Sequence, residues 1–213
     1  TSLLWEPNEY INIMVYPFTD SQILGISTFP YSLKDFFLEG TQQVSASWIT
    51  LENLSFPYCI SINSSYIYEQ STDERINQND AAITLAHELG HYLGLRHVFS
   101  EGGTTSMCTD TDYCKDTPSY NRSEYEQWLN NLDKQNKYQL KDLAKRYSCE
   151  KGEYEAHNIM DYAYCFYNEI TLEQRKRIRH ILNYSPLIPG PKESRIDTRG
   201  VQGRLNLPIC IMK

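Results

Sequence analysis

The first 70 residues carry short apolar runs separated by turn residues, which is the pattern of β-strands. Residues 10–16 alternate apolar and polar side chains, residues 25–29 form a second run, and a proline follows each of them. Two further runs, at 44–51 and 59–68, are rich in Ile, Tyr, Trp and Ser, and their aromatic and β-branched residues favour strands. We therefore expect four strands in this part of the chain.

A helix is expected next, because the apolar spacing changes from two residues to three or four. Asn79 or Asp80 can cap its first turn. The apolar face of this helix consists of Ile83, Ala86, Leu89 and Leu93.

Beyond residue 97 the pattern is less regular. Residues 100–120 hold Gly, Ser, Thr, Asp and Pro, which predicts a long ordered loop. A Ser-x-x-Glu pattern opens a charged helical stretch over 123–147, and a Thr-x-x-Gln pattern opens a helix over 171–182. From Pro186 onward, Pro and Gly predict an irregular segment that runs over the surface.

These elements predict an α+β (mixed α/β) protein. Residues 1–97 would form an N-terminal subdomain with a twisted mixed sheet and one helix, and residues 98–213 a more irregular C-terminal subdomain that ends in a helix. A chain of 213 residues is long enough to bury a core, so we expect a single domain over 1–213.

The charge balance argues against a nucleic-acid partner. The chain has 27 acidic and 20 basic residues, a formal charge of −7 and a pI near 5.3. A basic cluster at 175–179 lies in a predicted helix and indicates a solvated helix face, whereas nucleic-acid binding requires a broader basic surface. No apolar run approaches the roughly 20 residues that span a bilayer. We expect a monomer with neither nucleic acid nor a transmembrane segment.

The cysteines favour an oxidising compartment. There are six of them and no Cys-x-x-Cys pair, which is compatible with three disulfides in any of fifteen pairings. Most follow residue 100 in loop-like sequence, where a thiol would be exposed; buried thiols in a cytosolic protein are the alternative. The chain begins without Met or a signal-peptide pattern, so we expect a mature or trimmed segment. We therefore expect an exported protein, secreted, periplasmic or on the cell surface.

Residues 87–97 read His-Glu-Leu-Gly-His-Tyr-Leu-Gly-Leu-Arg-His and hold three of the five histidines of the chain. His87 and His91 are four residues apart, so they share one face of the predicted helix. Gly94 readily adopts the left-handed conformation that ends a helix, so the chain can turn there and bring His97 to the same ion. Three neutral imidazoles with one open position are the ligand set of a catalytic zinc, whereas chance histidines on a buried helix rarely reproduce so long a pattern.

Glu88 lies beside the first of these ligands and is the candidate general base. Zinc lowers the pKa of a bound water towards about 7 and polarises a substrate carbonyl. Glu88 would take a proton from that water and pass it to the leaving amine, which is the chemistry of amide-bond hydrolysis. Our hypothesis for the reaction is hydrolysis of internal peptide bonds. We expect the protein or peptide substrate to lie extended along an edge strand, with residues 59–68 as the candidate strand.

The segment Asn158-Ile-Met160-Asp-Tyr162 adds a second motif. With the zinc pattern it resembles the metzincin clan of zinc metallopeptidases, in which a Met-turn packs beneath the zinc-binding histidines. The resemblance makes Met160 the Met-turn residue, although methionine is also a common core residue. It also implies that Tyr162 approaches the zinc or the reaction intermediate and helps to stabilise the oxyanion. A packed aromatic ring is the alternative in a chain with 17 tyrosines.

Within the clan, the chain is most similar to the pappalysin family over roughly residues 10–182. The segments that carry this resemblance are Leu24-Gly-Ile-Ser-Thr-Phe-Pro30, Asp116-Thr-Pro118 and the Met-turn. The charged stretch over 124–151 looks like an insertion relative to the family.

The pappalysin resemblance also implies structural calcium in the loop that follows the zinc motif. Asp110, Asp112 and Asp116 are the candidate ligands. Lys115 stands where the family commonly has an acidic residue, so solvated loop acids are the alternative. The resemblance further implies disulfides between Cys149 and Cys165 and between Cys108 and Cys114, which leaves Cys59 and Cys210 as the remaining pair.

Two other functions remain open at this point. The same zinc chemistry serves an amidohydrolase that acts on small or cell-wall peptides. The second alternative is a latent form or a non-catalytic binding module on a metalloprotease scaffold. Such modules usually lose the general base or a metal ligand, whereas this sequence keeps the base and all three histidines.

Overall fold

The computed structural model describes residues 3–49, 58–72, 76–99, 109–133, 136–148, 150, 152–190, 192 and 209–212. Two compact units emerge. The first consists of 1–70, 79–95 and 176–213, and the second of 71–78 and 96–175. None of the helices in the described residues is long and apolar enough to cross a membrane.

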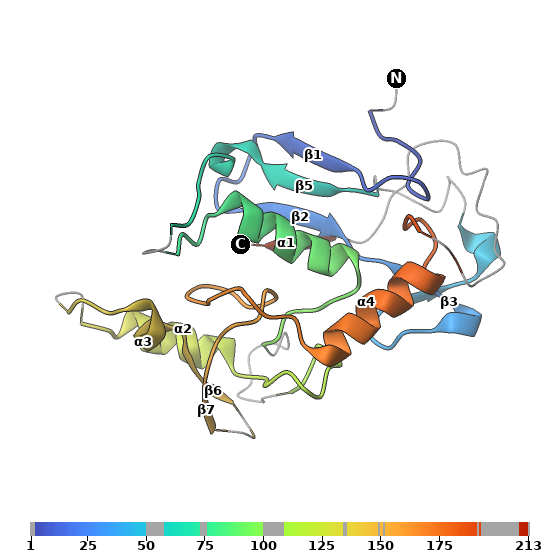
Figure 1. Ribbon diagram of the computed structural model, residues 1–213. Helices are drawn as coiled ribbons and strands as arrows, with labels where there is room; N and C mark the ends of the chain where they lie inside the picture. The colour runs from blue at the N-terminus through green and yellow to red at the C-terminus, as the bar shows by residue number, and fades with distance from the viewer. Residues whose placement is uncertain are drawn as a thin grey trace. The chain divides into compact units, whose positions relative to one another are not determined.

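The first unit is built on a four-stranded mixed sheet with the order β1-β5-β2-β8. Its strands are β1 (Ile13–Tyr16), β2 (Gly25–Thr28), β5 (Ile60–Asn63) and β8 (Ile209–Met212). β1 runs parallel to β5, whereas β2 is antiparallel to both of its neighbours, β5 and β8. Helix α1 (Ala81–Tyr92) packs against β2 and β5, as Figure 1 shows. The sheet therefore supports the helix that carries the zinc motif.

The core of this unit lies between the sheet, α1 and helix α4 (Leu172–Tyr184). Its fully buried members include Ile60 at the centre of the sheet, Tyr92 at the end of α1 and Ile181 on α4. A parallel pair, β3 (Tyr31–Leu33) and β4 (Gln42–Val44), closes one side with buried residues of its own. Short 3₁₀ turns follow β3, β4 and β5 at Lys34–Phe36, Ala46–Trp48 and Ser64–Tyr66.

The second unit is largely irregular, as expected. Its helices are α2 (Arg122–Asn130) and the one-turn α3 (Leu140–Leu143), and it also contains the first turn of α4. An antiparallel hairpin, β6 (Lys145–Ser148) and β7 (Gly152–Glu155), is its only sheet among the described residues.

Three of the sequence predictions about secondary structure are wrong. The run at 44–51 gives only the end of β4 and a 3₁₀ turn over 46–48, with residues 50 and 51 outside the described part. The helix expected over 123–147 is replaced by α2, α3 and β6. Helix α2 begins earlier than expected, because its N-cap is Asn121, whose Oδ1 accepts from the Glu124 amide at 3.3 Å. It ends at an Asn-Asn sequence, which favours turns over helix interiors.

The segment after Pro186 also differs from the prediction. Leu187 and Ile188 are fully buried in the core of the first unit, and residues 209–212 form β8. Burial of the Leu187 and Ile188 side chains outweighs the local Pro and Gly signals. By contrast, the Thr171–Gln174 capping box is confirmed. The Gln174 side chain accepts from the Thr171 amide at 3.0 Å, and the Thr171 hydroxyl accepts from the Gln174 amide at 3.3 Å.

Candidate active site

Helix α1 places the first half of the zinc motif in the interior. Asp80 caps the helix, since its Oδ1 accepts from the amides of Ala82 at 2.8 Å and Ile83 at 3.2 Å. His87 and His91, one turn apart, are buried with ring centroids 4.7 Å apart. Nδ1 of His91 lies 2.9 Å from the carbonyl oxygen of Leu95, which fixes the orientation of that ring.

The helix ends at a turn that only glycine adopts easily. Gly94 has φ of +87°, and a Cβ placed on it would lie 2.7 Å from Cγ1 of Ile181. Its carbonyl oxygen accepts from Nε and Nη2 of Arg177 at 3.3 and 3.2 Å, and Nη2 also donates to Glu39 O at 3.0 Å. Arg177 is therefore a buried support of this turn, whereas the sequence pattern indicated a solvated basic face.

The three motif histidines form a cluster suited to a metal. His87, His91 and His97 are all buried, and the nitrogens they offer lie within 4.8 Å of one another. Tetrahedral zinc holds imidazole nitrogens at about 2.0–2.1 Å, which separates them by roughly 3.4 Å, so small adjustments bring this cluster to zinc geometry. In the part of the chain that the structure describes, this is the one cluster of three or more metal-ligating side chains.

The Glu88 carboxyl has the features of a proton-transfer group. It is fully buried, and neither of its oxygens has a hydrogen-bond partner in the structure. Burial raises its pKa well above the ordinary value. Gly25 on β2 leaves room for it, since a Cβ there would lie 2.6 Å from Glu88 Cγ and 2.9 Å from Oε1. Buried carboxylate oxygens without partners call for a ligand or water, so this observation also fits a metal-bound water at the site.

Met160 and Tyr162 lie next to His97 within the second unit. The amide of Val98 donates to the carbonyl oxygen of Met160 at 3.3 Å, and the Met160 side chain is fully buried. The ring of Tyr162 meets that of His97 edge to face at 4.5 Å, while Phe99 stacks on the imidazole at 4.7 Å. The Met-turn segment and the third histidine are therefore packed together.

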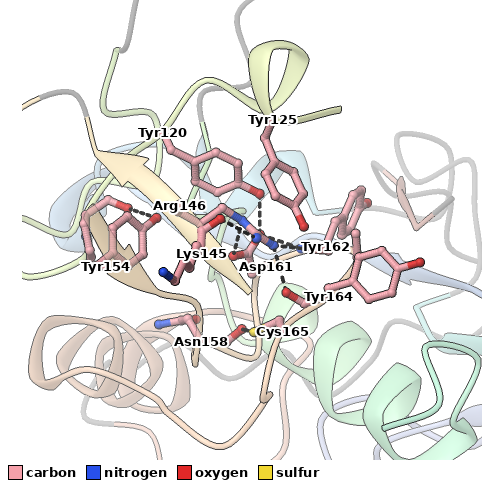
Figure 2. A network of polar contacts seen from close by, with 12 residues as sticks. Tyr120, Tyr125, Lys145, Arg146, Tyr154, Asn158, Asp161, Tyr162, Tyr164 and Cys165 are labelled. Atoms are coloured by element: carbon pink, nitrogen blue, oxygen red, sulfur yellow. Dashed lines mark hydrogen bonds and ion pairs between the residues drawn. The ribbon is translucent and has the colours of Figure 1, made fainter. Parts of the chain in front are cut away.

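A buried polar network that the sequence did not predict surrounds Asp161 and Tyr162 of the expected Met-turn (Figure 2). Arg146, on β6, is fully buried, and its Nε lies 3.6 Å from Oδ2 of Asp161. Oδ1 of Asp161 accepts from the Tyr120 hydroxyl at 2.5 Å and from the Tyr162 amide at 2.7 Å. The guanidinium also lies 3.6 Å from the ring centroid of Tyr125 and donates to the carbonyl oxygens of Leu143, Lys145, Tyr162 and Tyr164.

The network holds the backbone on both sides of Tyr162, because Asp161 accepts its amide and Arg146 donates to its carbonyl. Burial lowers the pKa of Arg146, but the Asp161 carboxylate and the phenol groups of Tyr120 and Tyr125 raise it overall. Nothing in the local Lys-Arg-Tyr-Ser sequence separates this residue from an ordinary surface arginine. Only the fold identifies it.

The three candidate calcium ligands are engaged in local hydrogen bonds. Asp112 accepts from the Cys114 amide and the Thr117 hydroxyl, and Asp110 accepts from the Asp112 amide. Asp116 accepts from the Thr171 hydroxyl at 2.8 Å and the Glu173 amide at 2.9 Å, both at the start of α4. These carboxylates thus stabilise loops and a helix end, and a calcium site on them stays a prediction.

Two of the three expected disulfides are absent, because their described cysteines are free thiols. Cys59 and Cys165 are buried thiols, and Sγ of Cys165 donates to Asn158 O at 3.3 Å. The pairings of Cys59 with Cys210 and of Cys165 with Cys149 are therefore not present. Cys108, the expected partner of Cys114, lies outside the described residues, as does Cys149.

Known proteins resemble this chain in both sequence and structure. Extracellular metalloproteases of Arthroderma benhamiae and Trichophyton verrucosum are each 37% identical over 108 residues, which is 49% of this chain and 32% of theirs. That of Arthroderma otae is 32% identical over 171 residues, 79% of this chain and 49% of its own. The chain thus spans a third to a half of the length of these relatives.

Mature mirolysin of Tannerella forsythia, solved in complex with a cleaved peptide, matches with a TM-score of 0.48 and 23% identity, over 83% of this chain and 53% of that one. The model of the M43 peptidase family, described as pregnancy-associated plasma protein-A, matches residues 40–183. This match covers more than half of the chain and includes both the zinc motif and the Met-turn. The chain therefore belongs to the pappalysin family of metzincin metallopeptidases.

Proposed function

We propose that the chain is a zinc-dependent endopeptidase whose metal is held by His87, His91 and His97. The observation that carries the proposal is the pairing of a buried three-histidine cluster with the buried carboxyl of Glu88, which has no partner of its own. A structural zinc site has four protein ligands, whereas three imidazoles leave a position for water. Membership in a family of metallopeptidases supports the same function.

When bound, zinc supplies a Lewis acid that polarises the scissile carbonyl and acidifies a coordinated water. Glu88 takes the proton from the attacking water and then delivers it to the amine that leaves. The second step requires the protonated carboxyl, and burial favours that form by raising its pKa. The same burial excludes bulk water, to which the proton would otherwise be lost.

Met160 and Tyr162 take supporting roles in this proposal. Met160 provides a buried apolar floor whose carbonyl is bonded to the residue after His97. Tyr162 packs its ring against the imidazole of His97. This position supports a role for its hydroxyl as a hydrogen-bond donor that helps the zinc to stabilise the oxyanion. Arg146 and Asp161 hold the backbone of Tyr162 and act as positioning residues.

The substrate we propose is a peptide or protein bound in an extended conformation. The strand that the sequence suggested for it, 59–68, does not have a free edge. The part of it that forms a strand, β5, lies between β1 and β2 and pairs with both, so its main-chain groups are already engaged. The reason is that strand order depends on distant segments of the chain, which the local pattern does not report.

The names of the relatives, all extracellular metalloproteases, support the proposal that this chain too is exported. Hydrolysis of small or cell-wall peptides remains the second candidate, because it uses the same site. A substrate screen with an unfolded protein, short peptides and cell-wall peptides separates the two. Cleavage confined to the small substrates would replace the endopeptidase proposal.

The first test is zinc content by elemental analysis, together with cleavage of an unfolded protein with and without a zinc chelator. We expect one zinc per chain and cleavage that the chelator abolishes. Glu88→Gln should keep the zinc and lose cleavage by at least about 10²-fold, the lower end for removal of a general base. Glu153→Gln, a change at an exposed carboxylate on β7, is the matched control. Unaltered cleavage by Glu88→Gln would remove this mechanism.

A further inference from the structure

The outer edge of β2 is occupied by a segment of the chain that lies far away in the sequence. β8 pairs antiparallel with β2, with Gly25 opposite Met212 and Ser27 opposite Cys210 as Cα partners. β8 is the last strand of the sheet on that side. The main-chain groups of β2 that would otherwise form a free sheet edge are therefore paired within the chain.

This edge is the one beside the proposed general base. Gly25 packs directly against the Glu88 carboxyl, as the room left by its missing Cβ shows. Met212 is the Cα partner of Gly25, so β8 runs next to the residue that touches Glu88, and β8 also contacts α1. The other edge of the sheet belongs to β1, two strands away from β2 and so about 10 Å further from Glu88.

We propose that residues 209–212 restrain the enzyme by occupying the edge of β2, the edge beside Glu88 with which an extended peptide substrate would pair as an antiparallel strand. The proposal rests on the endopeptidase function proposed above. A free sheet edge binds an extended peptide through main-chain hydrogen bonds with little regard to sequence. A strand already paired there excludes the peptide from the same bonds, so the chain restrains its own activity.

The competition has a defined kinetic form. The 20 residues 189–208 join β8 to the buried Leu187 and Ile188, a connection short enough for an effective concentration of the order of millimolar. A peptide present at micromolar concentration therefore competes against a large excess of β8. Displacement precedes binding and leaves the reacting groups unchanged, so β8 raises KM and leaves kcat as it is.

The register identifies the bonds to break. The Thr28 amide donates to the carbonyl oxygen of Cys59, the residue before β5, so the amide of Ser27, one residue earlier, faces β8. Ser27 and Cys210 are therefore a hydrogen-bonded pair, in which both main-chain groups of Cys210 face β2. Ile211, the next residue, has its amide on the side away from β2.

The first experiment locks β8 in place through its native cysteine. Hydrogen-bonded antiparallel partners have Cα atoms about 5.5 Å apart, which is within the range for a disulfide. The Ser27→Cys variant is oxidised, the disulfide between its introduced thiol and Cys210 is verified by peptide mass mapping, and the same sample is then reduced. We expect peptide cleavage to fall at least tenfold on oxidation and to return on reduction. Wild-type protein taken through the same cycle is the control for the other cysteines.

Binding is measured as well, because it does not depend on catalysis. Zinc-free Ser27→Cys is titrated with a fluorescent peptide and followed by anisotropy, before and after oxidation. We expect binding only in the reduced form. Equal binding in both forms, or failure of the two cysteines to link, would overturn the inference. Binding that follows the lock without any cleavage in either form would contradict the proposed function and leave the inference standing.

The second experiment releases β8. Cys210→Pro removes an amide that faces β2, so we expect KM to fall about fivefold, the size of effect for one main-chain hydrogen bond, with kcat unchanged. Ile211→Pro removes an amide that faces away, and Cys210→Ala removes only the thiol; both should leave KM near the wild-type value. Equal effects of the two proline variants would refute the register and with it the competition.

Discussion

Replacement of Arg146 by Met removes the cation that is ion-paired with a buried carboxylate beside the Met-turn. Arg146 is fully buried and Asp161 is 1% exposed, with Nε and Oδ2 3.6 Å apart. The change also takes away the donors to four carbonyl oxygens and a stacking contact with Tyr125. Met fills much of the aliphatic space, so loss of the charge and of the hydrogen bonds dominates the effect.

The expected cost follows from the burial of Asp161. Removing one partner of a buried ion pair destabilises a protein by about 3–5 kcal/mol, because the other charge is left without compensation. Against a typical unfolding free energy of about 5–15 kcal/mol, this is a large fraction. Adding Asp161→Asn to the variant removes the uncompensated charge, so the double variant should recover part of the loss, roughly 1–3 kcal/mol.

The assay is urea denaturation followed by tryptophan fluorescence and far-UV circular dichroism, on zinc-loaded and chelated protein. Lys145→Met is the matched control, because the neighbouring Lys145–Glu153 pair is 3.4 Å long but nearly half exposed on both sides. An exposed pair contributes about 0–1 kcal/mol. The reasoning is refuted if Arg146→Met costs no more than Lys145→Met, or if the double variant is no more stable than Arg146→Met.

Two further predictions concern single contacts. Gly25→Ala places a methyl group 2.6 Å from Glu88 Cγ and so displaces the carboxyl group. We expect the zinc content by elemental analysis to be unchanged and kcat/KM to fall by about 10²-fold. Full activity would show that Glu88 tolerates the displacement. Burial raises the pKa of Asp112 to about 7, so the folded protein holds a proton that the unfolded chain releases near pH 4. Stability should therefore fall as pH rises from 4 to 7, by up to about 1.4 kcal/mol per pH unit, and Asp112→Asn should flatten this slope in urea titrations; an equal slope in both proteins would contradict the assignment.

The parts of the site that the sequence predicted correctly are those set by neighbours in the chain. Helix α1, its Asp80 cap and the shared face of His87 and His91 depend on residues within one or two turns. The capping box at the start of α4 is local in the same sense. Such features follow from the helical repeat and from capping chemistry, and both are visible in the sequence.

The parts that the sequence did not predict depend on segments far apart in the chain. β5 was expected at an edge and lies inside the sheet, because β1 and β2 come from elsewhere to pair with both of its sides. The run Ile209-Cys-Ile-Met212 is apolar enough for a strand, but its partner, β2, lies more than 180 residues earlier. Hydrophobic pattern reports burial and period, and it does not report which strand is the neighbour.

The basic stretch of α4 shows how a tertiary requirement selects among similar residues. Arg175, Lys176, Arg177 and Arg179 all looked alike as a solvated helix face. Arg177 is buried because it lies one turn before Ile181, on the face of α4 that packs at the Gly94 turn. A buried carbonyl oxygen requires a hydrogen-bond donor. At the turn that ends α1, no donor from the described residues of the same segment reaches the Gly94 oxygen. The long side chain of Arg177 therefore supplies two N–H donors. In the sequence, the only feature that distinguishes Arg177 is its position four residues before Ile181, which places both on one helix face. This spacing predicts burial of Arg177 only when the need for a donor at the Gly94 turn is also known.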